Sequence, residues 1–218
     1  MGWFGFGKPR YDRSETISRA AKLEGRGKRK KAIAEYRKVL AQEPDNPAIA
    51  VKLAGLLAQT KQLDEARAKF LFAAETYEKQ AFDDKALAVY RQAVTYLPKR
   101  VELWERIAQL DVKRERPPDA IRDLLEGSRH FRRRPERQAA IRLLRMAVKV
   151  EPWQFEATMG LARLLAKEGA RPEARRFYEG LCQRNRALRL RKVRGAMFRM
   201  SPTPAAAWRW LRAALRGV

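Results

Sequence analysis

A helical pattern that returns every 54 residues constrains this chain more than any other feature of its sequence. The segment 86–98 has Ala86 and Tyr90 four residues apart, which places them on one face of a helix, and its closing proline ends that helix. The same pattern lies one period upstream in 32–44 and one period downstream in 140–152. A fixed period of this kind predicts stacked repeats, in which each unit buries its apolar face against its neighbours.

The spacing of apolar residues predicts helices along most of the chain, and no segment alternates as a strand would. We expect about ten helices in the repeat region, at 14–26, 28–42, 48–60, 65–80, 84–96, 101–116, 119–133, 136–150, 154–167 and 173–184. The helix 65–80 is unusually long and contains neither glycine nor proline. We expect it to pair with the helix before it and the helix after it, so that three helices fill one period.

Three helix pairs resemble the tetratricopeptide repeat, a helix–turn–helix motif with small and large apolar residues at fixed positions. The three copies carry Ala50, Leu53, Ala54, Leu57, Ala66 and Phe70; Trp104, Ile107, Ala108, Ala120 and Leu124; and Thr158, Leu161, Ala162, Leu165, Ala174 and Tyr178. The resemblance covers about residues 13–184 and implies an all-α, TPR-like α-solenoid, a right-handed superhelix of antiparallel helix pairs. Asp111 stands where an apolar residue is usual, so we expect that helix pair to be loosely packed or locally solvated.

The chain divides into three regions on this interpretation: an aromatic and basic N-terminal arm (1–12), the solenoid (13–184) and a basic amphipathic C-terminal extension (185–218). The aromatics of the arm suit either a membrane interface or packing on the first repeat. The formal net charge is +24, and residues 171–218 hold 13 Lys or Arg against 2 Asp or Glu. Such an excess favours anionic partners, which are nucleic acid, an acidic membrane surface or an acidic protein.

The residues that carry most enzyme chemistry are scarce. There is one histidine, His130, and one cysteine, Cys182, so the usual Cys/His zinc cluster cannot form. No glycine-rich phosphate loop and no Gly-x-Ser-x-Gly elbow occurs. We therefore predict a non-enzyme with no metal, no cofactor and no small-molecule substrate. We interpret His130 as a surface residue and Cys182 as a small buried hydrophobe near a helix end.

The resemblance implies a protein partner, held in the groove that the first helix of each repeat lines. One subgroup of the family clamps terminal carboxylates with Lys and Asn, but the matching positions here hold Ile17, Ala21, Val51 and Gly55, so that function is not implied. By analogy with the family, the groove-facing positions around helix 119–133 hold Arg122, Arg129, Arg132 and Arg133. Arginine grips carboxylates or phosphates through paired donors. The alternative is a solvated face that keeps the array soluble.

The C-terminal extension predicts a basic amphipathic helix after a proline-rich break. Thr203 is the expected N-cap and Pro204 the first-turn residue. One side of this helix holds Arg209, Arg212 and Arg216; the other holds Trp208, Leu211 and Leu215, with Trp210 at the edge. The helix can cap the last repeat, lie on an anionic membrane surface or dock on another protein.

We therefore expect a non-catalytic scaffold or adaptor that binds an acidic protein partner in the repeat groove. The alternative is a peripheral protein that the C-terminal helix holds at the inner face of a membrane. Nucleic-acid binding by the arginine-rich tail is less favoured, because its tryptophans share a helical face with leucines rather than forming an open stacking platform. We expect a cytoplasmic location, and the arginine- and alanine-rich composition suggests a bacterial source.

Overall fold

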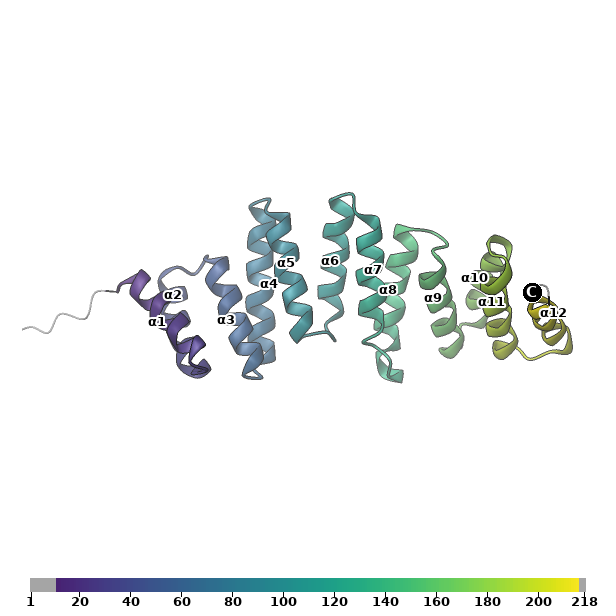
Figure 1. The fold of residues 1–218 in the computed structure, drawn as a ribbon, viewed down its shortest axis with the longest axis horizontal. Coiled ribbons are helices and arrows are strands. Elements are labelled where there is room, and N and C mark those ends of the chain that lie inside the picture. Colours follow the sequence, from purple (N-terminus) through teal and green to yellow (C-terminus); the bar gives the residue numbers. More distant parts are fainter. Residues whose placement is uncertain (1–10, 216–218) are drawn as a thin grey trace, which may run out of the picture. The chain divides into compact units, whose positions relative to one another are not determined.

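The computed structural model describes residues 11–215, so Trp3, Phe4 and Phe6 of the N-terminal arm and Arg216 lie outside the described residues. Over that range the chain is all-α, with twelve α-helices, one 3-10 helix and no strand (Figure 1). The elements are α1 (Arg13–Gly25), α2 (Arg29–Gln42), α3 (Pro47–Gln59), α4 (Leu63–Lys79), α5 (Asp83–Tyr96), α6 (Val101–Lys113), α7 (Pro117–Ser128), η1 (Arg134–Glu136), α8 (Arg137–Val150), α9 (Phe155–Lys167), α10 (Arg171–Arg184), α11 (Ala187–Met200) and α12 (Pro204–Leu215). The predicted ten helices of the repeat region are confirmed as α1–α10.

The 54-residue period recurs without drift in the residues at which the helices begin. The helices that begin 54 residues apart are α2, α5 and α8 at 29, 83 and 137; α3, α6 and α9 at 47, 101 and 155; and α4, α7 and α10 at 63, 117 and 171. The turn before each helix of the last series repeats as well, because Lys61, Glu115 and Gly169 all have positive φ. Each period therefore consists of three helices, as the pattern of apolar residues predicts.

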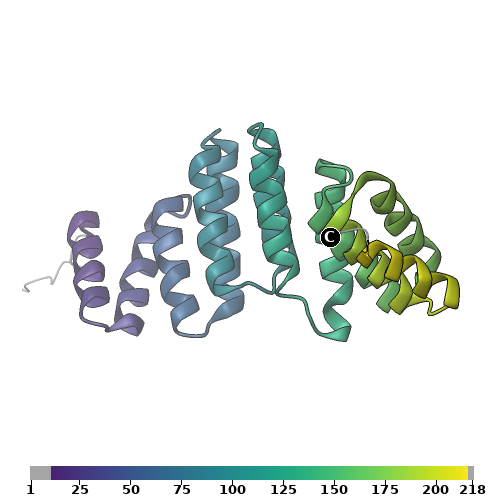
Figure 2. The same ribbon diagram turned by 45° about the vertical axis from the view of Figure 1, so that its right-hand side comes forward.

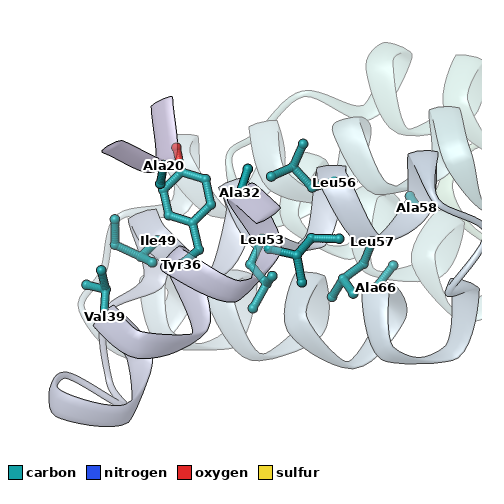
Figure 3. Close-up of a cluster of buried hydrophobic side chains, with 11 residues drawn as sticks. Ala20, Ala32, Tyr36, Val39, Ile49, Leu53, Leu56, Leu57, Ala58 and Ala66 are labelled. Carbon is teal, nitrogen blue, oxygen red and sulfur yellow. The ribbon is translucent and has the colours of Figure 1, made fainter. Parts of the chain in front are cut away.

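The chain forms two compact units, which divide between Leu97 and Pro98. In the first unit, α4 packs against both α3 and α5, which confirms the predicted sharing of one long helix between two pairs. Part of the core of this unit is a cluster of fully or almost fully buried side chains from α1 to α4, in which Tyr36, Leu53 and Leu57 lie among small alanines (Figure 3). The alanines Ala20 and Ala32 have no exposed surface. They therefore let neighbouring helices approach closely.

In the second unit, α7 packs against both α6 and α8, and α10 packs against α9 and α11. The last helix, α12, packs against α11 (Figure 2). Thr203 caps α12 as predicted, because its side-chain oxygen accepts the backbone N–H of Ala206 at 3.1 Å.

Helix α7 ends at Ser128, five residues before the expected end at residue 133. The hairpin turn that follows the matching helix of the first unit does not form here. In the first unit α4 ends at Lys79, and Ala81 follows with φ of 59°. One period later the same position is Pro135, whose ring holds φ near −65° and excludes that turn. The chain forms η1 instead.

Asp111 contradicts the expectation that its helix pair is locally solvated. Its side chain is fully buried on α6. The residues one period before and after it, Leu57 and Leu165, are buried as well. The position therefore belongs to the core whichever residue it carries.

Candidate partner-binding site

Three helix hairpins, α1/α2, α4/α5 and α9/α10, place a buried tyrosine in the same way. In each, a residue with positive φ stands two positions before the second helix: Gly27, Ala81 or Gly169. The tyrosine is the eighth residue of that second helix, and the three are Tyr36, Tyr90 and Tyr178. None of the three is more than 1% exposed. A buried phenol needs a partner for its hydroxyl, so the residue opposite each tyrosine matters.

In the first two hairpins the partner is a glutamate twelve residues earlier in the chain. The Tyr36 hydroxyl donates to Glu24 Oε2 at 3.2 Å, and the Tyr90 hydroxyl donates to Glu78 Oε1 at 2.7 Å. Burial, together with the negative charge of Glu24, raises the pKa of Tyr36 to about 12. The phenol therefore stays protonated and keeps donating at neutral pH.

In the third hairpin the residue twelve positions before Tyr178 is Ala166, which has no acceptor. A hollow of about 420 Å³ opens there, which we call the basic hollow; its lining is Arg163, Ala166, Lys167, Arg171, Tyr178, Ala196, Arg199 and Met200. Arg163 and Lys167 lie one turn apart on α9, and Arg199 comes from α11. The lining thus contains four cations and no carboxylate.

The electrostatics of the basic hollow favour an anion. Burial raises the pKa of Tyr178, and the nearby charges of Arg163 and Arg199 oppose that rise. Arg171 is the first residue of α10, so the positive end of that helix adds to the field of the side chains. A carboxylate there would accept hydrogen bonds from guanidinium groups, as the internal glutamates accept them from Tyr36 and Tyr90.

The four arginines that the family analogy selects do not share one helical face. Arg122 lies on α7, where its guanidinium pairs with Asp119 Oδ1 at 2.6 Å and Asp123 Oδ1 at 3.3 Å. Arg129, Arg132 and Arg133 follow the end of α7. Arg132 Nε donates to the backbone oxygen of Arg129 at 2.9 Å, and the backbone N–H of Arg133 donates to Glu136 at 3.3 Å. Arg122 and Arg129 line one shallow hollow of about 270 Å³, which also contains Glu126.

The C-terminal helix packs through Trp210, which the sequence pattern places only at the edge of the apolar face. The Trp210 ring stacks on Phe198 of α11 with centroids 6.3 Å apart, and it lies against Gly195. Trp208 and Leu211 remain 56% and 43% exposed. The side chain of Leu215, like Arg216, lies outside the described part of the chain.

His130 and Cys182, the histidine and the cysteine of the sequence, both pack against other side chains. His130 is half-buried rather than a surface residue, and its ring stacks on Trp104 with centroids 5.6 Å apart. Cys182 is half-buried, its Sγ lies 3.9 Å from Met197 Sδ, and burial raises the pKa of its thiol. Within residues 11–215, no group of three or more His, Cys, Asp or Glu side chains could hold a metal ion.

None of the helices within the described residues has the length and apolar character needed to cross a membrane.

The basic hollow is the feature that inspection of the sequence missed. Arg163, Lys167 and Arg171 have ordinary spacing for a solvated helix end, so nothing singles them out. The available signal was the twelve-residue spacing between glutamate and tyrosine. Glutamate stands twelve residues before Tyr36 and Tyr90, but alanine stands twelve residues before Tyr178.

Comparison with known proteins gives a family but no near relative. Two family models, both described as tetratricopeptide repeat, match residues 23–69 and 125–188. No curated protein matches the chain.

Solved structures of low similarity include the nearly identical TPR-like repeats attributed to a kinesin light chain of Podosopora anserina, at 18% identity and a TM-score of 0.42, with 87% of this chain and 97% of that chain covered. A tetratricopeptide repeat protein from Parabacteroides merdae has 17% identity and a TM-score of 0.31, covering 94% and 93%. PilF of Pseudomonas aeruginosa has 15% identity and a TM-score of 0.31, covering 94% and 89%.

Proposed function

Because this chain is a tetratricopeptide repeat protein, and such repeats generally mediate protein–protein interaction, we propose that it is a non-catalytic adaptor for an acidic protein segment. The segment binds at the basic hollow. One observation carries the proposal: Ala166 stands where the matching hairpins carry Glu24 and Glu78. The partner supplies the carboxylate that position 166 of the third hairpin does not carry.

The proposed recognition copies a contact that the chain makes twice within itself. A glutamate or aspartate of the partner accepts the Tyr178 hydroxyl, as Glu24 accepts that of Tyr36. The same carboxylate lies between Arg163 and Arg199, whose charges already act on Tyr178. Charge-assisted hydrogen bonds of this kind are the strong ones in protein recognition.

An extended acidic segment fits the basic hollow better than a single small anion. The four cations come from three helices and surround an open surface rather than one closed point. Several carboxylates in succession can therefore each meet a cation. Arg122 is not part of the proposal, because Asp119 and Asp123 already hold its charge. The loop arginines Arg129, Arg132 and Arg133 stay a second candidate surface.

The test is binding of a fluorescent hexaglutamate peptide, measured by anisotropy. The double variant Arg163→Gln/Arg199→Gln should weaken binding about tenfold or more, since a hydrogen bond to a charged group contributes roughly 1.5–3 kcal/mol. Ala166→Glu should weaken it as strongly, because it restores the internal acceptor of the other hairpins. The matched control Arg122→Gln should bind within about twofold of the wild type.

Two results would contradict the proposal, given circular dichroism that shows each variant to be folded. The peptide could bind Ala166→Glu and the double variant as tightly as the wild type. Alternatively, binding could be lost only in the triple variant with Arg129, Arg132 and Arg133 changed to glutamine. The second result would move the site to the loop after α7.

A further inference from the structure

Helix α12 has three distinct faces, and only one of them is used to pack against α11. Ala206, Ala207 and Trp210 share the face toward α11, where Trp210 meets Phe198 and Gly195. A second face holds Trp208 and Leu211, three residues apart. The third face holds Arg209 and Arg212, of which Arg209 also lines a hollow of about 400 Å³ with residues of α10 and α11. Capping the repeats and presenting an apolar stripe are therefore compatible in this helix.

The apolar stripe is exposed although the helix is docked. Trp208 is 56% exposed and Leu211 is 43% exposed. The guanidinium of Arg212 lies 5.6 Å from the centroid of the Trp208 ring, so a cation accompanies the aromatic at the surface. The backbone oxygen of Arg209 accepts a hydrogen bond from Arg194 of α11 at 3.1 Å. This bond and the stacking of Trp210 on Phe198 both fix α12 on α11.

The charge carried by α11 and α12 themselves has one sign, and Glu179 of α10 is the carboxylate that lines a hollow together with Thr203, Ala206 and Arg209. The sequence from Leu181 to Arg212 contains nine Lys or Arg residues and no Asp or Glu. An apolar stripe that contains tryptophan and lies beside arginines is the composition of a helix that rests in the interface of an anionic bilayer. Apolar burial and attraction to the headgroups then act on the same helix.

We propose that the Trp208–Leu211 face of α12 docks on an anionic lipid surface while Trp210 keeps the helix on α11. Trp208 and Leu211 enter the boundary between headgroups and acyl chains. Arg212, beside Trp208, remains at the level of the lipid phosphates, because a guanidinium keeps its charged end in the polar layer. This docking is independent of the basic hollow and of its proposed acidic partner.

Flotation of the full-length protein with vesicles tests the docking. Vesicles of phosphatidylcholine with about 30% phosphatidylserine should retain the protein, and vesicles of phosphatidylcholine alone should not. Trp208→Ser/Leu211→Ser should lower the affinity for anionic vesicles about tenfold or more, because the apolar contribution is lost and every arginine is kept. Trp210 stays in this variant, so α12 keeps its contact with α11.

The matched control is Leu63→Ser/Phe82→Ser, which removes two other exposed apolar residues, at 39% and 48% exposure. It should bind anionic vesicles like the wild type, and so should Ala166→Glu. A second readout is quenching of tryptophan fluorescence by brominated lipid, which should fall in Trp208→Phe. Equal flotation of the wild type and Trp208→Ser/Leu211→Ser would overturn the proposal, as would failure of the wild type to float. Binding of a DNA oligonucleotide that depends on Trp208, without flotation, would assign the face to nucleic acid instead.

Discussion

Gly180 shows how one residue decides the packing of a helix in the second unit. Trp153 adopts the left-handed region with φ of 72°, and its indole lies directly over Gly180 of α10. Phe177 meets the same indole edge-on with centroids 6.4 Å apart, and the Arg184 guanidinium lies 4.1 Å from its centroid. A Cβ at position 180 would overlap the six-membered ring of Trp153. The ring therefore requires a glycine beneath it.

Gly180→Ala should lower the free energy of unfolding by about 1–3 kcal/mol, because the added methyl displaces Trp153. Urea denaturation followed by circular dichroism measures the change. Gly25→Ala is the control, since Gly25 ends α1 and a Cβ there meets nothing within 4 Å. That variant should be as stable as the wild type or slightly more stable. Equal losses in both variants would mean that Trp153 does not depend on Gly180.

At the scale of the element, the turns decide where the helices end. Five hairpins of the described chain share the turn with positive φ two residues before their second helix, with glycine at positions 27 and 169, alanine at 81, lysine at 61 and glutamate at 115. A left-handed conformation is unfavourable for alanine because its Cβ crowds the following carbonyl oxygen. The α4/α5 turn, which has alanine at this position, is therefore strained where the two turns with glycine are not.

Ala81→Gly should raise the free energy of unfolding by about 0.5–1 kcal/mol, because the relief of strain exceeds the added entropy of the unfolded chain. Gly27→Ala makes the reverse change in the equivalent turn and should lower it by a similar amount. Thermal and urea unfolding of the two variants test the pair. If both changes shifted stability in the same direction, strain in this turn would not be the cause.

The helices could be predicted well from the sequence, because alanine and tyrosine recur at the spacing that the packing of neighbouring helices requires. Helix starts were within about two residues, which is the usual uncertainty of helix ends. Two helix ends were predicted too late, because α6 ends at Lys113 rather than at residue 116 and α7 ends at Ser128 rather than at residue 133. The second of these errors placed Arg129, Arg132 and Arg133 on a helix. The basic hollow escaped prediction because Arg163 and Arg199, far apart in the sequence, meet only when α9 and α11 pack.

At the scale of the whole molecule, the excess of positive charge governs how stability responds to salt. The chain carries 49 Lys or Arg against 25 Asp or Glu. Pairs such as Arg37–Glu65 and Arg145–Glu173, which lie two periods apart, neutralise only part of it. The remaining cations repel one another in the compact state.

Raising sodium chloride from about 50 mM to about 300 mM should therefore raise the thermal midpoint, because screening weakens repulsion more than it weakens the fewer ion pairs. Differential scanning fluorimetry measures the shift. Binding of hexaglutamate should weaken over the same range, so the two responses have opposite signs. A midpoint that fell with salt would show that the ion pairs outweigh the repulsion.

The unvarying period has a consequence for how such a chain can change its length. Helices α3, α6 and α9 all begin at the same point of the period. Duplication or loss of a whole period at that point, for example residues 47–100, would join helix ends that already succeed one another elsewhere in the chain. A duplication whose two ends do not lie at equivalent turns would put a helix residue where a turn residue must stand. The fold therefore permits growth in steps of three helices.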